Sequence, residues 1–300
     1  MTSVIDVRDL RKAYGDQVAV DGVTFAVETG ERFGILGPNG AGKTTTLEII
    51  EGLRPADSGE VTLLGAAPWP RRADLLRRVG VQLQSSAFFE KLTAGEQVRT
   101  FADLYGAPRA RAAELLEEVG LADRDGTRTE DLSGGQKQRL SLACALVHDP
   151  EVVFLDEPTA SLDPQARRNL WDLLGRLNAS GRTVVLTTHH MDEAEELCDR
   201  VAIMDHGRVL ALDTPAALVR GLGAPVRVTV LADALPVAEA EAIDGADAVH
   251  LDRDSLTLTT TRPEAVLAEL ARRGALEGLQ VHGATLEDVF LDLTGREYRA

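Results

Sequence analysis

Residues 37–44 have the types and spacing of a loop that binds phosphate. They read Gly-Pro-Asn-Gly-Ala-Gly-Lys-Thr and fill every fixed position of the pattern G-x-x-x-x-G-K-[ST]. Glycines let successive backbone N–H groups turn toward a phosphate, the lysine can reach β- and γ-phosphates, and the threonine hydroxyl can ligate Mg²⁺. An ordinary turn between a strand and a helix is the alternative. The predicted nucleotide-binding residues are Gly37, Pro38, Asn39, Gly40, Ala41, Gly42, Lys43, Thr44 and Thr45.

A second glycine motif lies in residues 132–136, which read Leu-Ser-Gly-Gly-Gln. Ser133 is predicted to cap a helix that runs through Val147. Glycines beside a helix N-terminus form another surface that can bind an anion, so the chain has two such surfaces but one complete phosphate loop. A flexible loop before a capped helix is the alternative interpretation. The candidate anion-binding residues here are Ser133, Gly134, Gly135 and Gln136.

Two predicted buried strands end in residues that can bind metal ions or move protons. The apolar run 152–155 stops at Asp156 and Glu157, and the run 183–188 stops at His189. Ligands bind at the carboxyl ends of parallel strands. At that edge Asp156 suits an outer-sphere contact with Mg²⁺, and Glu157 could orient and deprotonate a water molecule. Acidic residues also end strands by chance, and His189 could instead be an ordinary surface histidine.

Two further residues are candidates only beside the other motifs. Tyr14 is predicted to lie in a turn, residues 11–16, and could either offer a flat apolar face to an adenine ring or pack in the core. Gln84 follows a short strand predicted for residues 79–83 and could ligate Mg²⁺ through its carbonyl oxygen. A solvated turn residue is the usual role of a glutamine in that position.

Short apolar strands and amphipathic helices would position these residues. Residues 33–36 form a predicted strand before the phosphate loop, and residues 45–50 form a predicted helix after it, which is the context that such a loop needs. Further strands are expected at 4–7, 23–27 and 60–64, and further helices at 71–78, 94–105 and 109–119.

Length and composition predict two domains. The chain has 300 residues, 44 % of them apolar, which is too long for one minimal domain and enough to bury a large core. A formal net charge of −16 argues against a nucleic-acid partner, because phosphate backbones bind basic surfaces. The sequence has no signal-like start and no long apolar run. We therefore expect a cytoplasmic protein that reaches a membrane through a partner, with Cys144 and Cys198 reduced and buried.

Together, these motifs closely resemble those of the ATP-binding subunits of ABC transporters. The phosphate loop, Gln84, the motif 132–136, the pair Asp156-Glu157, Asp163 and His189 occur in the family's order over about residues 1–215. The joint presence of a phosphate loop and Leu-Ser-Gly-Gly-Gln is highly specific. The resemblance implies an ATPase that uses ATP and Mg²⁺ and powers a separate polytopic membrane permease.

The resemblance also implies roles for individual residues. Tyr14 would stack on adenine, Glu157 would be the general base, and His189 would contact the γ-phosphate. Gln84 would couple the Mg²⁺ site to the permease, and Asp163 would belong to the contact between subunits. Two copies would face each other head to tail, so that each ATP is held by the phosphate loop of one subunit and by Ser133–Gln136 of the other.

The C-terminal residues predict a small α+β appendage. Strands are expected at 226–230, 248–251, 255–261 and 279–283, with a helix at 263–274. The ending, residues 286–296, is similar to that of bacterial drug-efflux subunits of the ABC-2 class, including the daunorubicin-resistance type. A generic amphipathic C-terminal helix is the alternative.

The expected fold is therefore an α/β P-loop ATPase of the ABC type, with a mostly parallel sheet and an antiparallel β subdomain. Residues 1–220 would form the ATP-binding domain, including a helical subdomain at about 86–150, and residues 221–300 the appendage. The expected function is ATP hydrolysis that drives export of a drug or other hydrophobic compound, at the inner face of the cell membrane. The alternatives are a soluble ABC ATPase that acts on ribosomes or DNA, and an ordinary phosphotransferase.

Overall fold

The computed structural model describes residues 3–83, 88–159 and 162–295, and it divides into two compact units. The first unit ends at Pro215, and the second begins at Ala216. Each unit has its own apolar core. Within the described residues, no helix is both long and apolar enough to cross a bilayer.

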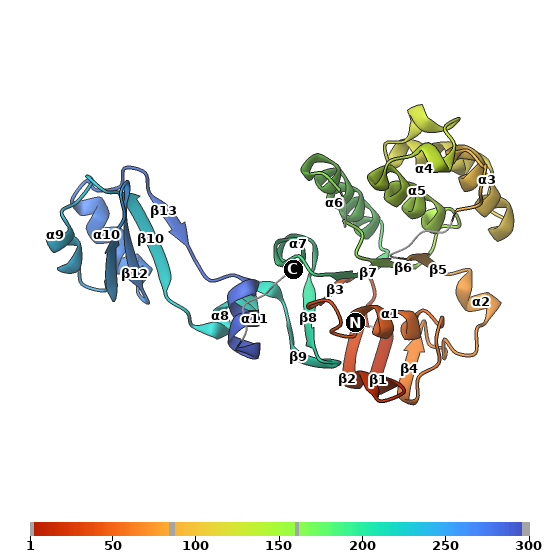
Figure 1. Ribbon diagram of the computed structural model, residues 1–300, viewed down its shortest axis with the longest axis horizontal. Coiled ribbons are helices and arrows are strands. Elements are labelled where there is room, and N and C mark those ends of the chain that lie inside the picture. Colours follow the sequence, from red (N-terminus) through yellow and green to blue (C-terminus); the bar gives the residue numbers. More distant parts are fainter. Residues whose placement is uncertain (1–2, 84–87, 160–161, 296–300) are drawn as a thin grey trace. The chain divides into compact units, whose positions relative to one another are not determined.

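A six-stranded sheet forms the centre of the first unit (Figure 1). Five strands are parallel, and only the edge strand β9 runs antiparallel to its neighbour β8. The apolar runs predicted as strands at 33–36, 152–155 and 183–188 lie inside this sheet, where both faces are covered, whereas the strand predicted at 79–83 lies at its edge. The order across the sheet is β5 (Val79–Gln82), β6 (Val152–Asp156), β7 (Thr183–Thr188), β3 (Arg32–Leu36), β8 (Arg200–Asp205) and β9 (Arg208–Asp213).

A second, antiparallel sheet of three strands packs over the same core. Its order is β2 (Gln17–Glu28), β1 (Ser3–Tyr14) and β4 (Ser58–Leu63). Side chains of this sheet, of the helix α1 (Lys43–Ile50) and of one face of the six-stranded sheet form a single apolar cluster. The turn expected at residues 11–16 is wrong in its extent, because β1 continues to Tyr14, which pairs with Gln17. Only Gly15 and Asp16 remain in the turn.

The helix expected at residues 71–78 is also shorter than predicted. Only one turn, α2 (Ala73–Leu76), is helical. The carbonyl of Arg78 accepts hydrogen bonds from the backbone N–H groups of Glu151 and Val152, at 2.8 and 3.3 Å. These bonds draw the chain into β5 at Val79, so tertiary contact ends the helix that local pattern favours.

Three helices, α3 (Ala94–Tyr105), α4 (Ala110–Glu118) and α5 (Gly134–Leu146), pack on one another beside the sheet, and α5 contacts β5 (Figure 1). Thr93 caps α3, and its hydroxyl and the side chain of Glu96 form a capping box. Two short 3₁₀ turns, Ala122–Arg124 and Thr129–Asp131, connect α4 to α5. The unit also contains α6 (Pro164–Ala179) and α7 (Met191–Leu197).

Both cysteines are free and buried, as expected. Cys144 lies on α5, and burial raises the pKa of its thiol to about 12. Cys198 follows α7, and burial raises the pKa of its thiol further. Its sulfur lies where a side chain at Gly34 would stand, since a Cβ built there would be 2.7 Å from Sγ.

The second unit has a four-stranded antiparallel sheet in the order β11 (Ala248–Leu251), β12 (Ser255–Thr260), β10 (Val226–Leu231) and β13 (Gln280–His282). Residues such as Val228 and Leu258 point from one face toward Val266 and Leu270 of α10 (Pro263–Arg272) and toward α9 (Val237–Glu241). Two further helices are α8 (Pro215–Leu222) and α11 (Leu286–Thr294).

Candidate functional site

The phosphate loop lies between β3 and α1, where strand, loop and helix follow one another as predicted. Gly40 and Gly42 have left-handed φ angles of 81° and 98°. Two of its glycines also lie against other backbone segments. A Cβ at Gly37 would stand 2.2 Å from the carbonyl oxygen of Met204, and one at Gly42 would stand 2.3 Å from that of Ala19. The backbone path of the loop therefore requires glycine at these positions.

Lys43 folds back across this loop. Its Nζ donates hydrogen bonds to the carbonyl oxygens of Gly37 and Pro38, at 2.8 and 3.1 Å. The same nitrogen lies 3.8 Å from Oε1 of Glu157. Desolvation lowers the pKa of Lys43, and the nearby carboxylate of Glu157 opposes that shift. A cation held at this depth is suited to bind the anionic oxygens of a phosphate.

A pocket of about 300 Å³ opens in front of the loop. Tyr14 is 43 % exposed at its rim, with Nζ of Lys12 at 5.6 Å and Cζ of Arg54 at 5.8 Å from the centre of its ring. The structure thus brings the predicted aromatic residue to the same pocket as the predicted phosphate ligands. The lining residues are Tyr14, Gln17, Ala19, Asn39, Gly40, Ala41, Gly42, Lys43, Thr44, Thr45 and Glu157.

Thr44 and Asp156 meet at the floor of the site, although 112 positions separate them in the sequence. Oγ1 of Thr44 lies 3.3 Å from Oδ1 of Asp156, and the hydroxyl of Thr187 donates a short hydrogen bond to the same oxygen. Burial raises the pKa of Asp156, against the opposing effect of these hydroxyls. Hydroxyl and carboxylate oxygens are the ligands that Mg²⁺ prefers, and these two fit a phosphate-bound Mg²⁺. Gln84, the third predicted ligand, lies outside the described residues.

In the part of the chain that is described, no group of three His, Cys, Asp or Glu side chains could hold a metal ion alone. A protein site built from one hydroxyl and one carboxylate instead matches the way Mg²⁺ binds with substrate phosphates.

Glu157 and His189 lie side by side at the ends of β6 and β7. Nδ1 of His189 is 3.2 Å from Oε1 of Glu157, and both side chains are largely buried. Glu157 has a left-handed φ of 48°, and its backbone is held on both sides. Its N–H donates to the hydroxyl of Thr187 at 3.0 Å, and its carbonyl accepts from Nε2 of Gln138 at 3.3 Å. A carboxylate in this place can accept a proton from water in front of the phosphate loop.

The second glycine motif forms the start of α5. Ser133 caps the helix, since its hydroxyl accepts from the N–H of Gln136 at 3.3 Å and its own N–H donates to Oε1 of Gln136 at 2.9 Å. Ser133 and Gly134 are exposed, and Gly135 and Gln136 are half-buried. Among the described residues that line the phosphate pocket, none belongs to this motif.

Asp163 has a structural task of its own. Its carboxylate caps α6, accepting from the N–H groups of Gln165 and Ala166 at 3.0 and 2.8 Å. His190 stacks obliquely on His189, with ring centres 4.2 Å apart, and burial lowers its pKa. The backbone N–H of His190 donates to Oγ1 of Thr188, whose hydroxyl in turn donates to Glu193 on α7.

Several residues around the site were missed by sequence reasoning. Gln138 and Thr187 hold the backbone of Glu157, and the buried side chains of Thr159 and Glu193 hydrogen-bond each other. The run Thr187-Thr188 directly before His189 was the available signal, because hydroxyls at a strand end can hydrogen-bond neighbouring loops.

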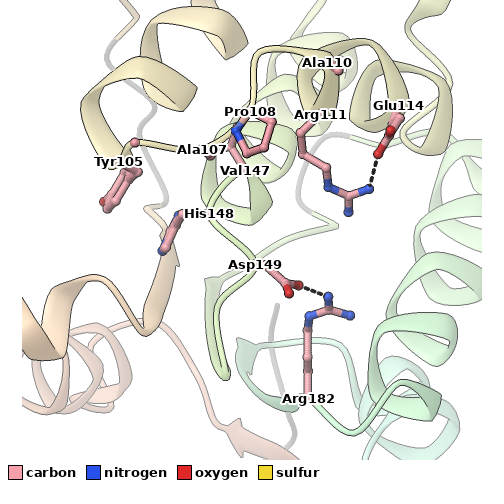
Figure 2. A pocket seen from close by; sticks show the side chains of 11 residues that line it. Tyr105, Ala107, Pro108, Ala110, Arg111, Glu114, Val147, His148, Asp149 and Arg182 are labelled. Atoms are coloured by element: carbon pink, nitrogen blue, oxygen red, sulfur yellow. Dashed lines mark hydrogen bonds and ion pairs between the residues drawn. The ribbon is translucent and has the colours of Figure 1, made fainter.

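A larger cavity, of about 540 Å³, lies at the other edge of the sheet (Figure 2). It is bordered by Asp149 and Arg182, which precede β6 and β7, whereas the phosphate site lies beyond the ends of these strands. His148 stacks on Tyr105 there, with ring centres 3.9 Å apart, and its Nε2–H donates to the carbonyl of Val79 at 3.0 Å. The remaining lining residues are Gly106, Ala107, Pro108, Ala110, Arg111, Glu114 and Val147.

Comparisons with known proteins agree with this geometry. A family model described as ABC transporter matches residues 20–160. The chain is 43 % identical to the Nod factor export ATP-binding protein I of Burkholderia orbicola (strain AU 1054) over 300 residues, which cover 98 % of this chain and 97 % of that protein. It is 41 % identical to the protein of the same name from Ralstonia nicotianae (strain ATCC BAA-1114 / GMI1000) over 309 residues, covering 99 % and 96 %.

Solved structures are similar over about seven tenths of the chain. An ATP-binding subunit of an ABC transporter is 32 % identical, with a TM-score of 0.68 over 74 % of this chain and 94 % of that one. A dimeric ATP-binding cassette in a post-hydrolysis state, bound to ADP and Pi, is 29 % identical, with a TM-score of 0.65 over 70 % and 98 %.

Proposed function

Because the chain belongs to the ABC transporter family as an ATP-binding subunit, we propose that it powers an ABC-2-type exporter through a separate membrane permease. The protein is an ATPase, and its hydrolysis of ATP is coupled to transport. Export is supported by relatives named as export proteins that match nearly the whole chain, appendage included. The substrate class that we propose is a drug or another hydrophobic compound. We place the subunit at the inner face of the cell membrane, held there by its permease.

The proposed chemistry follows from the side chains around the pocket. Lys43 and the loop amides would bind the β- and γ-phosphates, and Tyr14 would stack on the adenine. Thr44 and Asp156, with Gln84, would hold Mg²⁺, which when bound neutralises phosphate charge. The carboxylate of Glu157 would orient the attacking water and take its proton.

His189 completes this arrangement as a donor. Its ring lies beside Glu157, so it can hydrogen-bond a γ-phosphate oxygen while the carboxylate faces the water. Catalysis of phosphoryl transfer is mainly positioning and charge stabilisation, which is what a lysine, a metal site and a paired imidazole supply.

We further propose that two copies form two composite sites, head to tail. The observation that supports this most directly is the position of Ser133–Gln136. These residues form a capped, solvent-accessible helix N-terminus, yet they are not among the described residues lining the pocket of their own subunit. An anion surface of this kind can serve the nucleotide of a second subunit, with Asp163 beside the contact.

Mixing two inactive variants tests the composite site. Gly135→Asp places a carboxylate where the partner's γ-phosphate would dock, so the variant should bind ATP as a monomer but fail to dimerise or hydrolyse it. Lys43→Ala should lose ATP binding and hydrolysis. A mixed dimer restores one intact loop opposite one intact motif, so an equimolar mixture should regain ATPase activity that neither variant has alone.

ATP binding by the Gly135→Asp monomer, measured by calorimetry, is the control. If that variant cannot bind ATP, the motif belongs to its own subunit's site and the head-to-tail proposal is wrong. A mixture as inactive as its components would count against it as well.

A further inference from the structure

Glu193 is a buried carboxylate that joins two loops of the site. It lies on α7 with no exposed surface, and its Oε2 accepts two hydrogen bonds. One comes from the hydroxyl of Thr159 at 2.9 Å, and the other comes from the hydroxyl of Thr188 at 2.5 Å. A single oxygen atom therefore ties the segment after β6 to the end of β7.

These two threonines flank the residues that we propose to act on ATP. Thr188 directly precedes His189, and Thr159 lies two residues after Glu157. Both hydroxyls are buried in side chains with at most 2 % exposure, so water does not compete for the carboxylate. We call the carboxylate of Glu193 with its two threonine hydroxyls the junction. It holds the chain close to Glu157 and His189, whose side chains lie 3.2 Å apart.

The other oxygen of Glu193 shows that burying this carboxylate to bind two hydroxyls lowers the stability of the fold. Oε1 is buried, and within the described residues it has no hydrogen-bond partner. Burying an unsatisfied polar atom is unfavourable, and an apolar side chain of similar volume would avoid it. Buried polar groups that break such a rule are expected at functional sites.

We propose that Glu193 is a positioning residue for ATP hydrolysis, which holds Glu157 and His189 at the separation that the reaction needs. The inference rests on the roles proposed above for those two residues. It assigns no proton transfer to Glu193, which is not among the described residues that line the phosphate pocket. Its contribution is to keep two loops from moving apart, and misplacement of catalytic groups by about 1 Å can cost on the order of 100-fold in rate.

Substitution of Glu193 separates this role from simple stabilisation. In Glu193→Ala, kcat of the folded protein should fall about 10-fold to 100-fold, while Kd for ATP changes less than about threefold. Glu193→Gln keeps an oxygen for both hydroxyls and puts its NH₂ group in the place of Oε1, so kcat should return to within about threefold of the wild type. Glu196→Ala, an exposed position on the same helix, is the matched control and should leave kcat unchanged.

Two outcomes would overturn the inference. One is a folded Glu193→Ala protein with wild-type kcat. The other is an equal loss in the alanine and glutamine variants, which would show that charge and not hydrogen bonding matters. Glu157→Gln and His189→Ala, measured in parallel, distinguish the two proposals. If these two variants hydrolyse ATP normally, the assignment of the site is wrong. If only Glu193→Ala hydrolyses ATP normally, the site assignment stands and this inference alone is wrong.

Should Glu193→Ala not fold, Thr159→Val and Thr188→Val test the same junction one hydroxyl at a time. Each should lower kcat, and the double variant should lose less than the product of the two single losses, because both act through one oxygen. Losses that multiply would contradict a shared junction.

Discussion

At the scale of single residues, the site depends on how Glu157 is held. A left-handed φ in a residue with a side chain costs on the order of 1–3 kcal/mol and persists only where surrounding contacts enforce it. Here Thr187 holds the amide and Gln138 holds the carbonyl. The residue types of the site could be predicted from sequence, because each motif sets them locally. The contacts of Gln138 and Thr187 with Glu157 could not be predicted, because they form only through the packing of α5 and β7.

His148 provides a prediction at this scale that does not involve ATP. Burial lowers the pKa of His148, and the hydrogen bond to Val79 opposes that shift. The folded pKa thus lies below the unfolded value of about 6.5, so the unfolded chain takes up a proton first as pH falls, and stability declines through that range. His148→Gln keeps an N–H donor but does not titrate, so its free energy of unfolding should decline less between about pH 7.5 and about pH 5.5.

Urea denaturation at the two pH values measures this difference, which can reach about 1.4 kcal/mol per pH unit. His250→Gln, at an exposed position, is the control and should follow the wild type. Equal pH dependence of the wild type and His148→Gln would show that the imidazole does not titrate differently on unfolding.

At the scale of elements, the sequence predicted what is decided locally. The bounds of α3 and the strand, loop and helix around Lys43 follow from short-range patterns. The errors lie where tertiary pairing decides. Pairing with β2 extends β1 to Tyr14, and hydrogen bonds to the carbonyl of Arg78 shorten α2. Neither interaction leaves a periodic pattern in the sequence.

Gly42 tests how strictly one element constrains another. Gly42→Ala must accommodate both a φ of 98° and a Cβ contact of 2.3 Å with the carbonyl oxygen of Ala19 on β2. Such strain costs about 1–3 kcal/mol, so the loop should distort and the affinity for ATP should fall at least about 10-fold. Isothermal calorimetry measures the affinity, and thermal melting measures the stability.

Gly175→Ala is the matched control, because Gly175 is helical within α6 and a Cβ there would meet open space. This variant should gain about 0.5–1 kcal/mol of stability and bind ATP normally. Normal ATP binding by Gly42→Ala would instead mean that β2 yields to the added methyl group.

At the scale of the molecule, the two units have separate cores. Every member of the second unit's buried cluster lies between Val228 and Ala275, and the large cluster of the first unit ends at Met204. The strand patterns predicted after residue 220 indicated an appendage. The boundary between the appendage and the ATP-binding domain, however, depends on which side chains share a core. That sharing is a property of packing, which the order of residues alone does not display.

Separate cores predict that residues 1–215 fold without the appendage. The truncated protein should melt cooperatively and bind ATP with a Kd within about threefold of the full chain, because every described residue of the phosphate pocket lies in the first unit. Circular dichroism and calorimetry test both expectations. Loss of ATP binding on truncation would show that the appendage supports the site.

The two buried thiols have a practical consequence for labelling. Alkylating reagents and maleimide dyes attack the thiolate, and burial with a raised pKa denies Cys144 and Cys198 both access and ionisation. Neither native cysteine is therefore expected to react with these reagents in the folded protein. A cysteine introduced on its surface would take up a fluorophore or a spin label selectively, and a pair of such cysteines would make distances within the chain measurable.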